Sequence, residues 1–426
     1  VTVVRGPDTL VHDAWGFADL ELEVAARPDH VFRIGSVTKQ FTAAAIMREV
    51  EAGRIELDAP ITRYLPDLEL SRAIAVRDST GELVDTREMT EALTVTVRQL
   101  LHHTSGIRSY TSLPWEEWAR NFEMPREDLV ALFTAEPFDF EPGTEWRYDN
   151  SGYFLLGMIL EAVSGQSYEE YVTEHLFQPL GLERTHYCRN GPLVPGRVEG
   201  YDLGPDGALA NDEILDMRWP YAAGSLCAST GDLVRWSRAL HGGEVVSPGS
   251  YQAMVEPAVL PDGESTGYGF GLGVGDFHGH PFIAHGGGIN GFVSYLAYFP
   301  EEDAHIAVVV NTGGPGADRI YQALARELLG VEPPTDVPLA AEDRARYVGT
   351  YDLGSLQVRI WDEDGRMMAQ ATGQSSFRLL HQGDHTFVND GAGIRIVFEM
   401  EDGRAVAFVL HQGGREIRAP RVEGGG

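Results

Sequence analysis

The sequence predicts an α/β fold: an antiparallel sheet flanked by helices, with a mainly helical insertion, followed by a C-terminal antiparallel β-barrel. Three observations carry this prediction. Segments with β character lie at both ends of the first 330 residues, at 1–35 and 282–311. The region between them, about 61–281, is mostly helical in pattern, with loops rich in Pro, Gly and Asp. After residue 338 the pattern changes to short alternating runs separated by Asp-Gly pairs.

Length and composition limit the classes of protein to which this chain can belong. The chain has 426 residues, of which 43% are hydrophobic and 23% charged, so it is globular and we expect two or more domains. No run reaches the roughly 18 apolar residues that a membrane span needs. The net charge of −31 argues against nucleic acid or an anionic membrane as a partner. We expect a small-molecule or short-peptide substrate, and the sequence is compatible with a homo-oligomer.

The first 60 residues predict strands followed by a buried helix. Val1–Val4 and Thr9–Trp15 are expected to pair across a turn, and Val31–Ile34 forms a further short strand. Ser36 would cap or open a helix that runs to about Ala52 and ends at Gly53. This helix is apolar nearly all round, so it is expected to be central.

The rest of the first domain, 1–330, combines helices with a return to strands. Its α/β part comprises about 1–60 and 282–330, and about 61–281 is the helical region. Expected helices lie at Val97–Leu101, Gly152–Gly165, Leu226–Leu240 and Ala317–Leu329, and expected strands at Phe282–Pro300 and His305–Asn311.

The C-terminal part predicts a small barrel. A linker rich in proline spans 331–343, and the barrel spans 344–426. Alternating apolar residues, for example Leu356, Val358 and Ile360, predict strands with one buried face. Asp364-Gly365 and Asp402-Gly403 predict hairpin turns.

The chain has two cysteines, Cys188 and Cys227. Two are too few for a disulfide framework and lack metal-ligand spacing. The sequence does not decide whether they pair, and it favours two isolated buried thiols. No leader pattern is visible, and the sequence opens on Val1. Removal of a leader would place the protein outside the cytoplasm, and without one it would be cytoplasmic.

A Ser-x-x-Lys pattern at Ser36 and Lys39 is the first catalytic signal. The spacing puts both side chains on one face of a helix, with an amine within reach of a hydroxyl. Lys39 is the only lysine, and the other 32 basic residues are arginine. Arginine cannot be deprotonated at useful pH, so the single amine beside a serine suggests a general base.

Three further patterns extend this signal: Tyr148-Asp149-Asn150, His285-Gly286-Gly287-Gly288, and Leu100-Leu101-His102-His103-Thr104-Ser105-Gly106. In order and spacing, the chain resembles the class C β-lactamase-like serine hydrolases. That group includes penicillin-binding proteins, D-aminopeptidases and esterases, with the signatures Ser-x-x-Lys, Tyr-x-Asn and Lys/His-x-Gly. The resemblance covers about 1–330 and implies a β-lactamase/transpeptidase-like fold. The C-terminal part resembles the lipocalin-like barrel of related D-peptidases.

The predicted roles follow from chemistry and from this resemblance. Ser36 is the expected nucleophile, and Lys39, desolvated on a buried helix, the base that activates it. Tyr148 would pass a proton to the leaving group, and Asn150 would hold Lys39 and a substrate carbonyl. The Ser36 backbone N–H is one expected oxyanion donor.

The resemblance implies the rest of the site. It gives the second oxyanion donor as the N–H of Gly288, on an edge strand. His285 and Gly287 are the corresponding substrate-binding positions, and the glycines at 286–288 would let a substrate backbone approach. No cofactor or metal is expected.

Each of these residues also has a structural interpretation. Tyr148 or His285 alone would more often be a packed residue. The pair His102-His103 is read as a structural loop, because neighbouring side chains point apart. The aromatic residues that could line the cleft are Trp115, Trp118, Tyr268 and Phe270, and packing is the expected role of any single one.

The third motif narrows the function. Family β-lactamases carry Lys-Thr-Gly there, and His-Gly-Gly lacks the amine and hydroxyl that would meet a substrate carboxylate. The histidine form resembles the D-aminopeptidase and esterase branches of the family, and this resemblance implies a serine hydrolase for small peptides or amides with D-amino acids. The alternatives are a carboxylesterase for short acyl esters, and a β-lactamase or slow penicillin-binding sensor.

Overall fold

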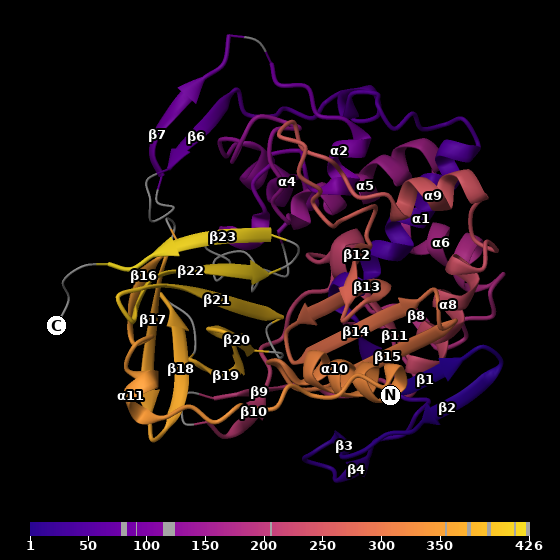
Figure 1. Cartoon of the computed structure of the whole chain (residues 1–426). Helices are drawn as coiled ribbons and strands as arrows, with labels where there is room; N and C mark the ends of the chain where they lie inside the picture. The colour runs from indigo at the N-terminus through magenta and orange to yellow at the C-terminus, as the bar shows by residue number, and fades with distance from the viewer. Residues whose placement is uncertain are drawn as a thin grey trace. The chain divides into compact units, whose positions relative to one another are not determined.

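The computed structural model (Figure 1) describes residues 1–77, 83–90, 92–113, 124–204, 207–353, 356–372, 376–389, 393–412 and 415–422. The chain divides into two compact units, one of Val1–Ala75 with Thr86–Ala325 and one of Val76–Asp85 with Arg326–Gly426. Each unit has its own cluster of buried hydrophobic residues. The expected limits of the domains and linker stay a prediction.

An antiparallel six-stranded sheet forms the centre of the first unit, as the sequence predicted. The strand order is β12-β13-β14-β15-β1-β2 (Figure 1). The first strand pairs with the last, with Val3 opposite Ile306, which brings the two ends of this unit together. The strands are β1 (Thr2–Arg5), β2 (Asp8–His12), β12 (Gly273–Phe277), β13 (His280–Ile289), β14 (Phe292–Phe299) and β15 (Ala304–Val310).

Two helices pack on this sheet. Helix α8 (Thr230–His241) contacts β1, β14 and β15. Helix α10 (Gly316–Leu329) stacks Tyr321 on Tyr295 of β14, with ring centroids 4.0 Å apart. These contacts bury one stripe of each helix, as expected for surface helices on a sheet.

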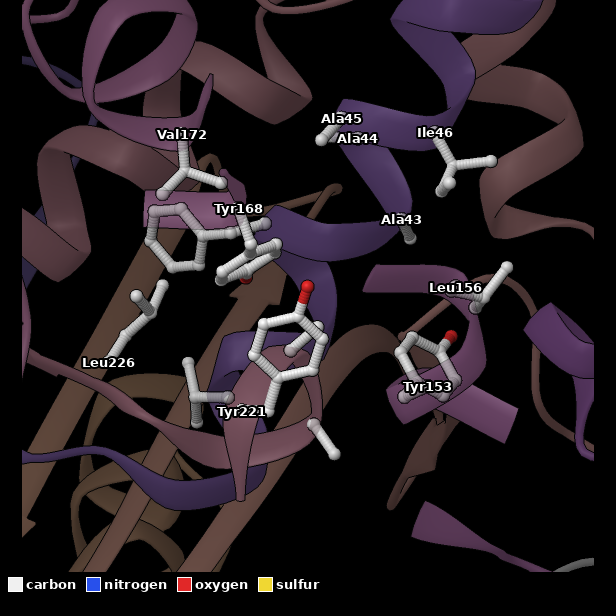
Figure 2. Packing of buried hydrophobic residues seen from close by; sticks show 14 of the residues in the cluster. Ala43, Ala44, Ala45, Ile46, Tyr153, Leu156, Tyr168, Val172, Tyr221 and Leu226 are labelled. Carbon is white, nitrogen blue, oxygen red and sulfur yellow. The ribbon is translucent and has the colours of Figure 1, made fainter. Parts of the chain in front are cut away.

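Helix α1 (Thr38–Glu51) is the buried centre of the helical region. Its small residues Ala43, Ala44 and Ala45 are fully buried, and Figure 2 shows them with the rings of Tyr168 and Tyr221 nearby. The surrounding helices are α2 (Val97–His102), α4 (Arg126–Thr134), α5 (Asn150–Ser164), α6 (Tyr168–Val172), α7 (Tyr221–Gly224) and α9 (Pro248–Val255). Short 3-10 or π turns lie at Gly35–Val37, Ile61–Arg63, Tyr110–Ser112 and Thr173–Phe177.

The prediction of a helix over Leu226–Leu240 is wrong for its first residues. Leu226–Ala228 is a strand, β11, that pairs with β5 (Phe32–Arg33) on one side and β8 (Thr185–Tyr187) on the other. The helix begins only after Ser229, whose side chain accepts the Asp232 N–H as an N-cap. A three-residue apolar run before a cap is equally compatible with a buried strand, and here tertiary pairing decides.

The prediction of two isolated thiols is also wrong. Cys188 and Cys227 form a disulfide, with their Cα atoms 5.5 Å apart. Cys227 lies on β11 and Cys188 directly follows the neighbouring strand β8, so sheet pairing brings the two side chains together. Thirty-nine residues separate them, and the sequence alone carries no signal for this pairing.

The second unit contains the predicted C-terminal barrel. Eight antiparallel strands run in chain order, and β16 and β23 approach each other through a bridge between Tyr351 and Arg421. Asp364 and Asp402 have positive φ, as do the glycines after them, which confirms the two hairpin turns. The strands are β16 (Gly349–Asp352), β17 (Gln357–Glu363), β18 (Arg366–Ala371), β19 (Phe377–Gly383), β20 (Thr386–Asn389), β21 (Ile394–Glu401), β22 (Arg404–Gln412) and β23 (Arg415–Pro420).

The remaining elements are short. They are the two-stranded pairs β3 (Phe17–Asp19) with β4 (Val24–Ala25), β6 (Ala73–Arg77) with β7 (Leu83–Glu88), and β9 (Tyr201–Leu203) with β10 (Leu209–Asn211), and the helix α11 (Ala341–Arg344). Within the described residues, none of the helices has the length and apolar character needed to cross a membrane.

Candidate active site

Ser36 lies in the tight turn that leads into helix α1. The turn Gly35–Val37 is a 3-10 helix, and no side chain caps it, so Ser36 opens the helical segment without capping it. Gly35 has a φ of +49°, and a Cβ there would lie 2.9 Å from the carbonyl oxygen of Gly288. Only glycine fits this position, and it holds Ser36 beside the end of strand β13.

The amine of Lys39 is the centre of a buried hydrogen-bond network. Its Nζ lies 3.2 Å from Ser36 Oγ, 2.7 Å from Asn150 Oδ1 and 2.9 Å from the carbonyl oxygen of Ala223. Lys39 is fully buried, although Ser36 is partly exposed. The three-residue spacing therefore brings the amine within hydrogen-bond distance of the Ser36 hydroxyl, and the amine is the more deeply buried of the two groups.

Burial sets the protonation state of this amine. It lowers the pKa of Lys39 to about 7, against a weaker opposing effect of the Asp149 carboxylate. Near neutral pH, a sizeable fraction of Lys39 is then unprotonated and able to accept a proton from Ser36. Among the described residues, no carboxylate forms an ion pair with this amine, and its three hydrogen-bond partners are neutral groups.

Tyr148 lies beside both Lys39 and Ser36. Its ring centroid is 4.8 Å from Lys39 Nζ. Burial raises the pKa of Tyr148 and the Ser36 hydroxyl opposes that rise, so the phenol keeps its proton. Among the described residues, its buried hydroxyl has no hydrogen-bond partner in good geometry. The arrangement leaves a protonated phenol available at the reacting centre.

Asn150 is the first residue of helix α5 and is held from three sides. Its Oδ1 accepts from Lys39, its Nδ2 donates to Thr111 Oγ1 at 3.2 Å, and its backbone N–H donates to Ser109 Oγ at 3.1 Å. The expected bond to Lys39 is therefore present. The Thr111 bond fixes which end of the amide faces the amine.

The residue between Tyr148 and Asn150 was not singled out from the sequence. Asp149 caps helix α5 by accepting the Gly152 N–H at 2.5 Å. Its own N–H donates to His103 Nδ1 at 3.2 Å, and the His103 ring centroid lies 4.4 Å from that of Tyr148. A helix-capping Asp directly before an apolar helix was a readable signal for the cap. The contact with His103 joins segments 46 residues apart, which the sequence does not reveal.

His103 itself is a buried, neutral positioning residue. It ends helix α2 with a φ of 60°, and it has no solvent exposure. Burial lowers its pKa. His102 is the last residue of helix α2 and His103 is its cap, so the stretch predicted as a loop begins inside a helix. Within the described part of the chain, no group of three or more His, Cys, Asp or Glu is placed to hold a metal ion.

His285 lies in the site with both ring nitrogens engaged inside the protein. Its Nδ1 donates to the carbonyl oxygen of Gly286 at 2.5 Å, and its Nε2 accepts from the Tyr268 hydroxyl at 2.8 Å. Burial and nearby Lys39 lower the pKa of His285 to about 3, so it is neutral. Tyr268, for which the sequence favoured packing over lining the cleft, orients this ring. A direct contact of His285 with substrate stays a prediction.

Gly287 and Gly288 lie where strand β13 passes the nucleophile. A Cβ at Gly287 would lie 2.0 Å from the carbonyl oxygen of Ile34, so no other residue fits. A Cβ at Gly288 would meet no atom within 4 Å, which leaves space on that side of the strand. The predicted oxyanion role of the Gly288 N–H stays a prediction.

The expectation that this glycine lies on an edge strand is corrected by the sheet order. Strand β12 is outside β13, but its pairing stops at Gly273 opposite Ala284. His285–Ile289 therefore extends past the end of β12, paired only with β14. Within the described residues, one backbone edge of this stretch has no strand partner, although β13 is an inner strand. Trp115 and Trp118 lie outside the described residues.

Comparison with known proteins identifies a family for the first 330 residues. The sequence model of the family described as "Beta-lactamase" matches residues 1–330. This range contains Ser36, Lys39, Tyr148, Asn150 and the His285–Gly288 stretch.

Individual relatives share the fold and part of the sequence. Penicillin-binding protein 4* of Bacillus subtilis (strain 168) is 26% identical, over 99% of this chain and 94% of that protein. A D-aminopeptidase of Gluconobacter oxydans (strain 621H) is 27% identical over 82% of this chain, which spans 62% of that protein. The octameric penicillin-binding protein homologue from Pyrococcus abyssi has a TM-score of 0.65 and 25% identity, covering 98% of this chain and 94% of that one.

Proposed function

Since this chain belongs to the beta-lactamase family, whose members described above include a penicillin-binding protein and a D-aminopeptidase, we propose that it is a serine hydrolase acting through a Ser36 acyl-enzyme. The proposed substrates are small amides or peptides that contain D-amino acids. The observation that carries the acyl-enzyme is Lys39, a fully buried amine with a pKa of about 7, 3.2 Å from Ser36 Oγ.

The first half-reaction follows from these positions. Unprotonated Lys39 takes the proton of Ser36 as Oγ attacks the substrate carbonyl carbon. The N–H groups of Ser36 and Gly288 are the proposed donors to the oxyanion, and such a donor is typically worth about 3–4 kcal/mol of barrier. Tyr148, which keeps its proton, donates it to the leaving amine and regains one from protonated Lys39.

The second half-reaction returns the enzyme to its starting state. Water attacks the acyl carbon, and its proton passes through Tyr148 and Lys39 to Ser36 Oγ as the ester bond breaks. The acid is then released and Lys39 is again unprotonated. No group outside the chain is needed to balance either step.

The third motif supports substrates without a free carboxylate. His285 is neutral because burial depresses its pKa to about 3, and both of its nitrogens are used internally. The two glycines after it supply no side-chain donor. A carboxylate at this edge would therefore meet no cation from the motif, in a chain whose net charge is −31.

The preference for D-amino acids is supported by the D-aminopeptidase relative. A short-chain carboxylesterase is the second candidate, because a neutral third motif suits a neutral ester equally well. In both cases Ser36 would carry the acyl group.

A hydrolysis panel tests the proposal. D-alanine p-nitroanilide, its L isomer, p-nitrophenyl acetate and nitrocefin are compared by kcat/KM in one buffer, with Ser36→Ala as the blank. We expect the D-anilide to exceed the L isomer and nitrocefin to be the poorest substrate. If only the ester is hydrolysed, the carboxylesterase hypothesis replaces the proposal of an amidase. If nitrocefin is best, the argument from the third motif is wrong, and a burst without turnover would indicate a slow penicillin-binding sensor.

A further inference from the structure

A second cavity lies in the first unit, apart from the residues of the candidate active site. Its volume is about 460 Å³, which is in the range of small-molecule sites. Its lining comes from the start of α4, from α5 and α6, and from the segments 187–192 and 216–221. Neither the Ser-x-x-Lys pair, nor Tyr148 and Asn150, nor the glycines of β13 belong to that lining.

The wall of this cavity combines aromatic rings with ion pairs. Phe154, Tyr187, Trp219 and Tyr221 provide apolar surface. Its three ion pairs join a guanidinium to a carboxylate: Arg126 with Glu161 at 2.5 Å, Arg189 with Glu169 at 2.5 Å, and Arg218 with Asp216 at 2.6 Å.

These pairs define the chemistry of a suitable ligand. A bare anion or cation would have to compete with an existing partner for each charge. A zwitterion offers a carboxylate to a guanidinium and an ammonium to a carboxylate, while an apolar or aromatic side chain covers the rings. The cavity therefore fits a free amino acid with an apolar side chain.

The cavity shares one wall with the catalytic lysine. The segment 219–223 provides Trp219 and Tyr221 to the cavity, and two residues later the Ala223 carbonyl accepts from Lys39 at 2.9 Å. The Ala222 carbonyl accepts from Thr42 on the same helix at 2.6 Å. Tyr221 has a φ of +40°, a conformation that costs free energy for a non-glycine residue and that packing must hold.

We propose that this cavity is a regulatory site for a free amino acid with an apolar or aromatic side chain, which acts on Lys39 through the segment 219–223. The choice of ligand rests on the proposed function, because hydrolysis of an amino-acid amide releases such a molecule. A ligand that contacts Trp219 and Tyr221 moves the segment 219–223, and this weakens the hydrogen bond between the Ala223 carbonyl and the Lys39 amine. Occupancy therefore slows acylation of Ser36.

Binding is measured by calorimetry with D- and L-phenylalanine on the whole chain, and with phenylacetate and phenethylamine as singly charged analogues. We expect at least one phenylalanine isomer to bind saturably, about tenfold or more tighter than either analogue, since each analogue leaves one charge unmatched. Equal affinity of the analogues, or no saturable binding, overturns the proposal.

Two variants locate the binding site. Gly191 lines the cavity, and a Cβ there would meet no atom within 4 Å, so Gly191→Trp fills the space without a clash at its base. Gly249→Trp is the matched control, at an exposed glycine of α9 that also has no neighbour within 4 Å. We expect phenylalanine binding to be lost in the first and kept in the second. Binding kept in Gly191→Trp overturns the location.

A covalent label separates this site from the substrate cleft. Protein fully labelled at Ser36 by a fluorophosphonate is titrated with the same amino acid, and we expect binding to persist. Saturating amino acid should also slow the labelling of free enzyme by about threefold or more, a barrier change of the size common in allosteric coupling. Loss of binding after labelling, or an unchanged labelling rate, contradicts the proposal. Amino-acid binding and the rate of Ser36 labelling can both be measured without knowing which amide or ester the enzyme hydrolyses. A failure of the proposed function can therefore be told apart from a failure of this proposal.

Discussion

Lys39 is a buried amine that forms no direct ion pair within the described part of the chain. Its three hydrogen-bond partners are a hydroxyl, an amide oxygen and a backbone carbonyl. A buried ammonium is unfavourable without a paired charge, and this brings its pKa to about 7. The base is therefore a product of burial, and the rest of the site keeps the amine aimed at Ser36.

Replacing Lys39 tests its role as base. Lys39→Arg keeps a charge that cannot be released, and Lys39→Met keeps the length of the side chain without the amine. We expect each to lose about 10³-fold or more in kcat/KM, as removal of other catalytic residues does. Circular dichroism and thermal melting check that the variants fold. Retention of a tenth of the activity in a folded variant would sink the assignment.

The Asp149 carboxylate predicts the direction in which the pH dependence of activity shifts when it is removed. Activity should rise with pH as Lys39 loses its proton, with an acid limb near pH 7 in kcat/KM. The Asp149 carboxylate raises the pKa of Lys39, so Asp149→Asn should move this limb to lower pH, while Asn still caps helix α5. Glu49→Gln, which removes a buried carboxylate on the same helix α1, is the control and should leave the limb in place. A limb that moves to higher pH in Asp149→Asn contradicts the account.

The sequence could predict the chemistry at this scale but not the surroundings of the reacting groups. Ser36 and Lys39 are three apart on one helix, so their contact follows from local geometry. Ala223, His103 and Tyr268 reach the site from distant segments through tertiary packing. An alanine carbonyl in particular has no signature, because every residue provides one.

At the scale of elements, the packing of α8 against the sheet buries His305 and partly buries His241, and the proposed reaction uses neither. His305 on β15 accepts from or donates to Ser237 Oγ at 2.8 Å, and His241 lies 2.7 Å from the Tyr251 hydroxyl. Tyr298 stacks against both rings. Burial lowers the pKa of His241 to about 3 and that of His305 to about 4.

These histidines make folding sensitive to acid. Their usual pKa of about 6.5 in the unfolded chain exceeds the folded values, so the unfolded state binds more protons between pH 6.5 and about 4. Stability is complete above pH 6.5 and falls as the pH drops through this window. His241→Phe should reduce the loss of urea midpoint between pH 7 and 5. A slope unchanged from the parent protein would refute this explanation.

The two hydrophobic clusters predict that the barrel can be removed. The larger cluster contains residues up to Val309, and the barrel cluster contains Tyr347–Ala419. A chain ending at Gly330 should therefore fold and still react at Ser36 with a fluorophosphonate. The control is the same chain with Ser36→Ala. Failure to fold would show that the barrel is part of the main core.

Elements were predictable where a local signal was strong. The buried helix after Ser36 and the alternating strands of the barrel follow directly from periodicity. The strand Leu226–Ala228 was missed because three apolar residues fit either structure. The disulfide was missed because it depends on the pairing of β8 with β11 across 39 residues.

At the scale of the whole molecule, the net charge of the chain and the uncharged third motif favour the same kind of substrate. The net charge of −31 and a third motif without a cation both disfavour anionic substrates. One relative is octameric, and that assembly is a property of the Pyrococcus protein. The family explains the motifs and the fold, while the substrate depends on the walls of the cleft, which no sequence motif specifies.

The central claim is that Ser36 carries the acyl group with Lys39 as its base, and the most direct test is mass spectrometry of the acid-quenched enzyme. The protein is mixed with p-nitrophenyl acetate at neutral pH, quenched during the first turnovers and digested for peptide mapping. The account predicts one acetyl group on Ser36, absent in Ser36→Ala and formed far more slowly in Lys39→Met. An acetyl group on another residue, or equally fast acetylation of Ser36 in Lys39→Met, would contradict it.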